Sequence, residues 1–338
     1  MEINNKQNES EEKKREGTEY LNILRMPKGK KNSLGYEIQK ALNEISSIRA
    51  RPFICYVSNV LNPVVMGSGS VSIDNSDDGP FMEMLRTIPE DERNIDIILV
   101  TPGGSADSVD FFVKKLRQHF DNIVFILPYM AMSAGTIFCL SGDEIIMTDS
   151  AFVGPIDPQV PSFDGRYVPA QSLFALLDFI RERGNNQLKR SMPPNWTDIE
   201  LIRRIDPKEL GNAITASQLS TKLVTDYLFH YKFRNWVAKE NGEKVSEDDK
   251  QKRAKEIASL LCNNAEWLSH GSRITREIAK DKCKLKIIHA EEIEYLDSSI
   301  KRFWALIQYA FESTSIAKIF VSKDYFLVRD ALARLGNN

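Results

Sequence analysis

The chain of 338 residues carries 45 Lys and Arg against 47 Asp and Glu, for a net charge of −2, and 42% of its residues are hydrophobic. This length allows one large α/β domain or two smaller ones, and the hydrophobic content is typical of a globular protein. The balanced charge, without a basic stripe of interleaved aromatics, excludes a dominant nucleic-acid surface.

The first elements are an arm, a helix and a strand. Residues 1–18 are polar and charge-rich, which predicts disorder, and they lack the apolar segment of a signal peptide. A helical segment follows over 19–50, and its apolar positions between 35 and 49 have amphipathic helical spacing. The apolar run 53–57 then predicts a buried strand. The Gly-, Ser- and Asp-rich stretch 66–80 predicts a surface loop that borders a substrate groove.

The central stretch alternates strands with helices. Apolar runs predict strands, and periodic spacing between them predicts helices. This alternation indicates an α/β fold of repeated βα units, in which active-site residues follow the carboxyl ends of the strands. The expected strands are Ile95–Val100, Ile123–Leu127 and Glu144–Met147, and the segments between them are a helix with apolar positions from Val109 to Leu116 and an apolar segment from Ile137 to Leu140.

The C-terminal half is predicted to be mainly helical. Helical periodicity covers 170–182 and, as a long amphipathic run, 213–237. The stretch 181–198 is basic, polar and Pro-containing and is expected to be mobile, and 239–255 is charged and solvated. A strongly amphipathic helix is expected from Ile300 to Phe311. The longest apolar stretch, 123–140, is broken by Pro and Gly and is rejected as a membrane span.

Ser133 is the candidate nucleophile. It lies between small residues where a strand meets a helix, so its hydroxyl can be exposed beside unpaired amide N–H groups of the helix start. Gly104 follows an earlier strand and can bring a bare backbone N–H close to the same point. We expect the amides of Gly104 and Ala134 to form an oxyanion hole. The alternative is structural: Ser133 would cap a helix, and the Gly103-Gly104 pair would be a tight turn.

Three motifs carry a resemblance to a known family, namely Thr101-Pro102-Gly103-Gly104, Ala131-Met132-Ser133-Ala134-Gly135-Thr136 and Gly154-Pro155-Ile156-Asp157-Pro158-Gln159. In this order they resemble the serine dehydrogenase proteinase family, which is related to signal peptide peptidase A and to the protease ClpP. The resemblance covers roughly residues 35–325. It implies a ClpP/crotonase-like peptidase domain over 51–290, a C-terminal helical extension over 291–338, and a homo-oligomeric assembly.

Lys222 is the first candidate for the base that activates Ser133. A serine hydroxyl is a weak nucleophile until a base removes its proton. A lysine desolvated by apolar neighbours, here Leu219, Leu223 and Val224, can act as a neutral amine. Spacing alone favours a solvated surface lysine. The resemblance favours the catalytic role, because the family carries a lysine at the start of the matching helix and related peptidases use a Ser–Lys dyad.

His270 and Asp157 are the other candidates. Histidine has an ordinary pKa suited to general base catalysis near neutral pH. His270 lies shortly before a helix start at Ile274–Glu277, and members of the family it resembles carry a histidine at this position. Asp157 lies 24 residues after Ser133, where a ClpP-like protease carries its histidine, so a triad in the ClpP order is in doubt. A permuted triad of Ser133, His270 and Asp157 is chemically reasonable, and Asp157 can instead shape the cleft. Lys222 is preferred, with His270 as the close alternative.

The sequence therefore predicts a serine peptidase that forms an acyl-enzyme on peptide substrates. No pyridoxal-phosphate, nicotinamide or metal motif is found, so no cofactor is expected. The four cysteines are scattered, without a CxxC pair, which favours a reducing, cytoplasmic environment. Two other readings are open: a crotonase-like enzyme that handles acyl-CoA thioesters with the same paired amides, and a non-catalytic oligomeric scaffold.

Overall fold

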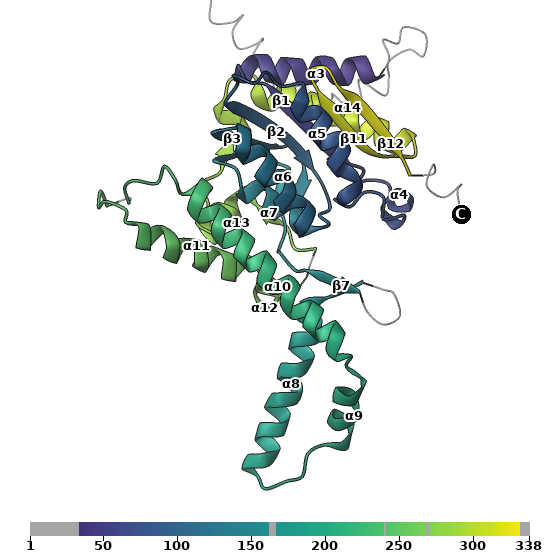
Figure 1. The fold of residues 1–338 in the computed structure, drawn as a ribbon, viewed down its shortest axis with the longest axis vertical. Coiled ribbons are helices and arrows are strands. Elements are labelled where there is room, and N and C mark those ends of the chain that lie inside the picture. The colour runs from purple at the N-terminus through teal and green to yellow at the C-terminus, as the bar shows by residue number, and fades with distance from the viewer. Residues whose placement is uncertain (1–33, 162–166, 240, 268, 270, 332–338) are drawn as a thin grey trace, which may run out of the picture. The chain divides into compact units, whose positions relative to one another are not determined.

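The chain forms two compact units in a computed structural model, which describes residues 34–161, 167–239, 241–267, 269 and 271–331 (Figure 1). The first unit comprises the chain up to Val153 together with everything from Ile274 onward. The second unit runs from Gly154 to Arg273. The expected disordered arm, 1–18, and the start of the expected helical segment 19–50 lie outside the described residues.

A seven-stranded sheet forms the centre of the first unit, in the order β10-β5-β3-β2-β1-β11-β12. Strands β10, β5, β3, β2 and β1 are parallel, whereas β11 runs antiparallel to β1 and β12 antiparallel to β11. This sheet confirms the predicted α/β class and the strands expected from the apolar runs. Its strands are β1 (Phe53–Ser58), β2 (Asn94–Val100), β3 (Asn122–Leu127), β5 (Glu144–Met147), β10 (Ile288–His289), β11 (Ile316–Ser322) and β12 (Phe326–Asp330).

Helices α3 (Leu34–Arg49) and α14 (Leu296–Ser313) pack together over one face of this sheet (Figure 1). Alternate strand residues, such as Cys55 on β1 and Ile98 on β2, join the apolar faces of both helices in one core cluster. Side chains alternate between the faces of a strand, so the remaining residues face the opposite side. The short 3-10 helix η3 (Ala290–Glu292) leads into α14.

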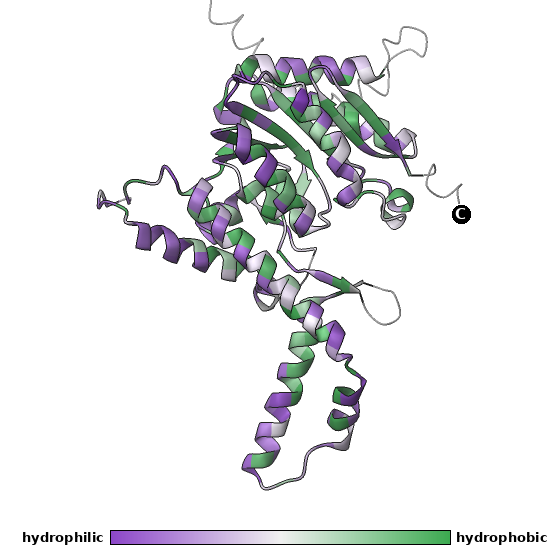
Figure 2. Ribbon diagram, in the orientation of Figure 1, coloured by the Kyte–Doolittle hydropathy of each residue, from purple (hydrophilic) through white to green (hydrophobic). Residues whose placement is uncertain are grey.

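Helices α5 (Asp78–Arg86), α6 (Ala106–His119) and α7 (Ala134–Leu140) supply the core on the other face. Phe81 of α5 stacks on Phe112 of α6 with ring centroids 4.1 Å apart. Phe138 of α7 packs edge-on against Phe125 of β3 at 4.8 Å. A parallel sheet covered on both faces needs strands that are apolar throughout, which explains the uninterrupted apolar runs. Figure 2 shows the central strands as predominantly hydrophobic.

A small three-stranded sheet, in the order β4-β6-β9, completes the first unit. Strand β9 leads to α13, whose N-cap Thr275 accepts a hydrogen bond from the Ile278 N–H, as the predicted helix start requires. The remaining elements of this unit are β4 (Met130–Ala131), β6 (Phe152–Val153), β9 (Ile274–Thr275), α4 (Pro63–Gly67), the 3-10 helix η1 (Asn75–Asp77) and α13 (Arg276–Asp281).

The second unit is mostly helical and contains a two-stranded hairpin. Its longest helix, α10, begins where Asp206 accepts a hydrogen bond from the Lys208 N–H and Pro207 takes the first helical position. Helices α8 and α11 both pack on α10. The elements are β7 (Gln159–Pro161), β8 (Tyr167–Pro169), α8 (Ala170–Lys189), α9 (Trp196–Arg204), α10 (Pro207–Tyr227), the π-helix η2 (Leu228–Lys232), α11 (Glu247–Leu261) and α12 (Asn264–Trp267).

Helical elements occur in two stretches for which none were expected, the predicted surface loop 66–80 and the predicted mobile stretch 181–198. The stretch 66–80 contains η1 and the start of α5, and it buries Val71, Ile73 and Asp77, so it is not a surface loop. The burial of these residues could not be predicted from the sequence, because a composition rich in Gly and Ser indicates turns but says nothing about burial. The stretch 181–198 comprises the second half of α8, the non-helical connection 190–195 and the start of α9.

The C-terminal part differs from the expected helical extension over 291–338. Helix α14 is present, but β11 and β12 follow it, and β11 pairs with β1 inside the central sheet. The antiparallel pairing joins residues more than 250 positions apart, such as Ser58 and Lys318. Periodicity within one segment cannot reveal such a partner, because the pairing depends on the rest of the sheet.

Candidate active site

Ser133 occupies a strained turn between β4 and α7. Its backbone angles are φ 50° and ψ −116°, a combination that L-residues rarely adopt and that costs about 1–3 kcal/mol. Its side chain makes no capping hydrogen bond to α7, and the residue is partly exposed. The alternative reading of Ser133 as a helix cap is therefore not what the structure shows. Such strain is concentrated at functional sites in proteins.

Backbone pairing ties the Ser133 turn to the end of β2. The Thr101 N–H donates to the Met130 carbonyl at 2.9 Å, and the Met132 N–H donates to the Thr101 carbonyl at 3.0 Å. The Thr136 hydroxyl donates to the Ala131 carbonyl at 2.9 Å, which closes the turn from the helix side. The two motifs predicted to form one site are thus hydrogen-bonded neighbours.

Gly103 lies directly against Ser133. With φ +104°, it has a backbone conformation that disfavours side chains. A Cβ added to Gly103 would lie 2.8 Å from the Ser133 Cβ and 2.7 Å from the Met132 carbonyl oxygen. It would also lie 3.3 Å from the Ala134 amide nitrogen. Only glycine leaves the space between this turn and the start of α7 open.

Gly104 is held in place by Ile73. The Ile73 N–H donates to the Gly103 carbonyl, and the Ser105 N–H donates to the Ile73 carbonyl, both at 2.8 Å. This is a parallel bridge in which Ile73 brackets Gly104, so the N–H of Gly104 itself points away from Ile73. Gly104 is exposed, and its φ of +145° again favours glycine.

The N–H groups of Gly104 and Ala134 donate no hydrogen bond to any residue that the structure describes. The Gly103 N–H, by contrast, donates a hydrogen bond to the Thr101 hydroxyl oxygen at 3.1 Å. Backbone N–H groups are almost always paired unless water or a ligand reaches them. Ser133, Gly104 and Ala134 therefore lie in two loops of one unit that are hydrogen-bonded to each other, and both amides are available to donate to a ligand.

The candidate bases lie elsewhere in the chain. Lys222 and Asp157 belong to the second unit, and His270 lies outside the described residues. Lys222, on α10, is exposed, so the desolvation expected from Leu219, Leu223 and Val224 is not found around it. Asp157 is fully buried, as a residue that shapes a site or orients another group can be.

Asp157 and α10 are brought together around Cys262 in the second unit. Burial raises the pKa of the Cys262 thiol to about 11; a hydrogen bond with Thr221 lowers it, and the charge of Asp157 raises it further. Thr221 and Asp157 therefore both lie close to this thiol. Lys222 follows Thr221 by one position, which turns its side chain about 100° around α10. Sequence reasoning did not single out Cys262, because a lone cysteine without a spacing motif carries no signal.

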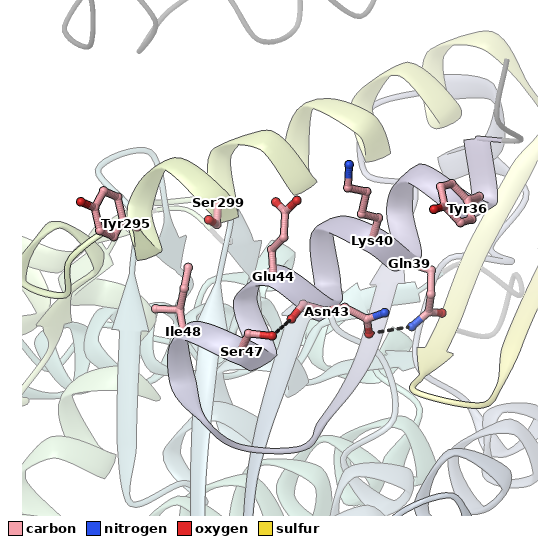
Figure 3. A pocket seen from close by; sticks show the side chains of 9 residues that line it. All are labelled: Tyr36, Gln39, Lys40, Asn43, Glu44, Ser47, Ile48, Tyr295 and Ser299. Carbon is pink, nitrogen blue, oxygen red and sulfur yellow. Dashed lines mark hydrogen bonds between the residues drawn. The ribbon is translucent and has the colours of Figure 1, made fainter. Parts of the chain in front are cut away.

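A surface groove of about 580 Å³ lies away from the Ser133 turn (Figure 3). It is formed by the outer side of α3 and the start of α14, and polar side chains such as Gln39, Lys40 and Glu44 line much of it. None of its lining residues belongs to the three strand-end motifs. No group of three or more His, Cys, Asp or Glu that could hold a metal ion occurs in the described part of the chain.

Parts of this chain are similar to known proteins. A family model described as "ClpP-like SDH-type serine proteinase" matches residues 20–186. Two proteins of Methanocaldococcus jannaschii, named uncharacterized protein MJ1495 and MJ0137, are 38% and 37% identical to this chain over 103 residues. That stretch is 30% of this chain and 32% and 33% of the relatives, so the chain matches about a third of the length of these curated relatives.

Two solved structures of the 1510-N membrane-bound stomatin-specific protease are also similar. One, a serine-to-alanine mutant, has a TM-score of 0.36 and 14% identity and covers 64% of this chain and 74% of that chain. The other, a lysine-to-alanine mutant in complex with a substrate peptide, has a TM-score of 0.35 and 13% identity and covers 76% and 80%. Within the described residues of the present chain, no helix combines the length and apolarity needed to cross a membrane.

The matched region includes all three motifs that carry the sequence resemblance, from Thr101 to Gln159. The predicted family is thereby confirmed. Over residues 20–186 this chain is similar to the ClpP-like, SDH-type serine proteinases.

Proposed function

We propose that this protein is a serine peptidase that hydrolyses peptide bonds through an acyl-enzyme on Ser133. The observation that carries the proposal is the strained turn itself: the Ser133 hydroxyl makes no capping bond, the turn packs against Gly103, and the amide N–H groups of Gly104 and Ala134 donate to no described residue. Similarity of residues 20–186 to a serine proteinase family supports the same chemistry. Acyl transfer needs a nucleophile and a preorganised site for the oxyanion, and the turn supplies both.

The proposed reaction has two steps, acylation of Ser133 and hydrolysis of the acyl-enzyme. The Ser133 oxygen attacks the peptide carbonyl while its proton passes to the base, and the negatively charged oxygen is held by the Gly104 and Ala134 N–H groups. The base then gives this proton to the leaving amine, which leaves the acyl group on Ser133. Water, deprotonated by the same base, attacks the ester, and the serine recovers its proton as the acid product departs.

Lys222 or His270 serves as the base in this proposal, with Asp157 as an orienting or cleft residue. Lys222 is exposed on α10, so in this proposal substrate or a neighbouring chain removes water from it. His270 needs no such desolvation, because its ordinary pKa is near neutrality. Single variants of the two residues therefore distinguish the mechanisms.

Fluorophosphonate labelling with intact-mass measurement tests the proposal, because this probe reacts with activated serines. The wild-type protein should gain one label, and Ser133→Ala should gain none. Ser150→Ala is the matched control: Ser150 is exposed and lies outside the turn, so this variant should label normally. No label on folded wild-type protein would overturn the peptidase proposal and direct attention to acyl-CoA binding or to a scaffold role.

The same assay identifies the base. Loss of labelling in Lys222→Ala but not in His270→Ala would assign the lysine, and the reverse result would assign the histidine. Lys208→Ala provides the control, since Lys208 is an exposed lysine on the same helix. Asp157→Asn should keep labelling if Asp157 only shapes the cleft, and lose it together with His270→Ala if the permuted triad operates.

Self-association and a cytoplasmic setting complete the proposal. Helix α8 is 20 residues long, yet only Ala170 and Ile180 are buried along it. Together α8 and α9 expose large apolar side chains, which is typical of surfaces that pack against another chain. We assign this helical pair to contacts between copies of the protein. No disulfide joins the four cysteines and three of them are buried, which supports a reducing compartment.

A further inference from the structure

A buried carboxylate, Asp77, lies behind the loop that holds Gly104. It accepts hydrogen bonds from the Lys318 ammonium at 2.6 and 2.9 Å, from the Tyr56 hydroxyl at 2.8 Å and from Arg329 at 2.7 Å. The Asp74 N–H adds a fourth donor at 3.2 Å. Asp77 and Lys318 are both fully buried. Elements β1, β11, β12 and η1 thus converge on one carboxylate.

Burying the charged groups of this cluster carries a large desolvation free energy. Removing two charges from water is so costly that apolar replacements of similar shape are often neutral or stabilising. Burial lowers the pKa of the Lys318 ammonium, and the charge of Asp77 opposes that effect. Burial also raises the pKa of the Tyr56 hydroxyl, and the Asp77 charge raises it further. A buried charged cluster of this kind fixes the relative positions of its hydrogen-bonded groups, and it adds little to the free energy of unfolding.

Lys318 connects the cluster to the loop at Gly104. Its third hydrogen bond goes to the Ser72 carbonyl at 2.7 Å, so all three ammonium protons are directed to acceptors. The next residue, Ile73, forms the two hydrogen bonds that bracket Gly104. A Cβ at Gly104 would come within 2.3 Å of the Ile73 carbonyl oxygen, so the two backbones are in direct contact.

We propose that Lys318, anchored by Asp77, is a positioning residue that fixes the Ser72–Ile73 backbone and thereby aims the Gly104 N–H at the oxyanion. This inference rests on the proposed peptidase function of Ser133. Lys318 touches neither Ser133 nor the amides of the hole, and it acts only through the Ser72 carbonyl. Small displacements of a preorganised donor reduce the rate of the chemical step far more than they reduce substrate binding.

Lys318→Met tests the proposal, because methionine fills similar space without the ammonium. Asp96→Asn is the matched control. Asp96 is also buried and is paired with Arg49 and Arg51, but it lies near the start of β2, about 16 Å of strand before Thr101. Both variants lose a buried charge, and both are assayed at a temperature at which circular dichroism shows them folded.

Turnover of p-nitrophenyl acetate and the rate of fluorophosphonate labelling are the first readouts. Lys318→Met should lower kcat at least about tenfold with KM little changed, and should slow labelling to the same degree, as expected for a displaced oxyanion donor. Asp96→Asn should keep the wild-type kcat. Equal kcat values in Lys318→Met and Asp96→Asn would overturn the positioning role while leaving the peptidase proposal intact.

Hydrogen–deuterium exchange provides a readout that does not depend on activity. In Lys318→Met, the amides of Ile73 and Ser105 should exchange at least about tenfold faster, because the Ser72 carbonyl has lost its anchor. Unchanged exchange at both amides would overturn the inference. Wild-type protein that neither turns over the ester nor takes the label would instead overturn the proposed function, and with it this inference.

Discussion

Gly103 and Ser133 lie so close that a methyl group added to the glycine would come within 2.8 Å of the serine Cβ. The two residues belong to different βα loops, and Thr101 links these loops through backbone hydrogen bonds to Met130 and Met132. The strained turn at Ser133 therefore has its shape imposed by the loop after β2. Neither loop can adopt this geometry alone, because each supplies part of the packing of the other.

Gly103→Ala should abolish fluorophosphonate labelling of Ser133. The new methyl group would overlap the Met132 carbonyl at 2.7 Å and would require a φ of +104°, so the turn must shift. We expect a loss of about 2 kcal/mol or more in the free energy of unfolding. Thermal denaturation and intact-mass labelling check both effects.

Gly79→Ala is the control for Gly103→Ala. Nothing lies within 4 Å of a Cβ at Gly79, which is in helix α5. Alanine is the better helix former, so this variant should be unchanged or more stable by up to about 1 kcal/mol. Normal fluorophosphonate labelling of Gly103→Ala would show that the contact between Gly103 and Ser133 is not needed for the reactivity of Ser133.

Arg117 should be far more important for stability than a comparable surface arginine. Its guanidinium contacts the Asp143 carboxylate at 3.0 Å, and both side chains are more than nine-tenths buried. The same carboxylate accepts the Ile123 N–H at 2.8 Å, so the pair joins α6 to the edges of β3 and β5. Arg117→Met leaves the carboxylate without this partner and should cost about 3–5 kcal/mol in urea denaturation.

Arg93→Met offers the matched comparison for Arg117→Met. Arg93 pairs with Asp121 at 3.2 Å, but the two side chains are 53% and 71% exposed. Water and salt screen such a pair, so the variant should lose at most about 1 kcal/mol. Equal losses in the two variants would show that burial does not decide the contribution of these pairs.

Tyr56 should make the protein sensitive to alkaline pH. Burial, and then the charge of Asp77, raise the pKa of its hydroxyl well above the ordinary value of 10. Above pH 10 the unfolded chain loses this proton while the folded chain keeps it, so the unfolded state binds fewer protons and stability falls as pH rises. Tyr56→Phe should reduce this fall between pH 10 and about 12, measured by denaturation at each pH.

Tyr36→Phe is the control for this pH series. Tyr36 is 57% exposed on α3, so Tyr36→Phe measures how the loss of a surface tyrosine hydroxyl affects the same denaturation series. An unaltered slope in Tyr56→Phe would show that the hydroxyl ionises in the folded protein, against the burial and hydrogen bond described for it.

Elements whose apolar pattern lies within one short segment could be predicted from the sequence. The apolar runs of β2, β3 and β5 and the helical spacing of α6 each occur within one short segment, so pattern alone placed them. The Ser133 turn was also predictable, because glycine and a serine between small residues at strand ends point to close backbone approach. The base of the proposed mechanism cannot be predicted in this way, because its identity depends on contacts between segments far apart in the chain.

The cluster around Asp77 shows why the rest could not be predicted. Lys318 and Asp77 are 241 positions apart, and no spacing rule links them. The only local signal was a lysine inside the apolar run of β11, which usually indicates a solvated face. The sheet is covered on both sides, so this lysine is buried, and the loop expected over 66–80 is the segment that covers it.

Substitutions on α9 should weaken self-association. Trp196 is 74% exposed, and Ile199 and Ile202 follow it at intervals of three residues, so all three lie along one side of the helix. Exposed charges of both signs accompany them, as in the Glu200–Arg203 pair, which suits contact with a second copy of the same surface. The double variant Trp196→Ser, Ile199→Ser should lower the mass measured by light scattering after size exclusion, at unchanged helix content. Val64→Ser, at an equally exposed position in the first unit, should leave the mass unchanged, and a wild-type protein that is already monomeric at micromolar concentration would contradict the assignment of α8 and α9 to a subunit contact.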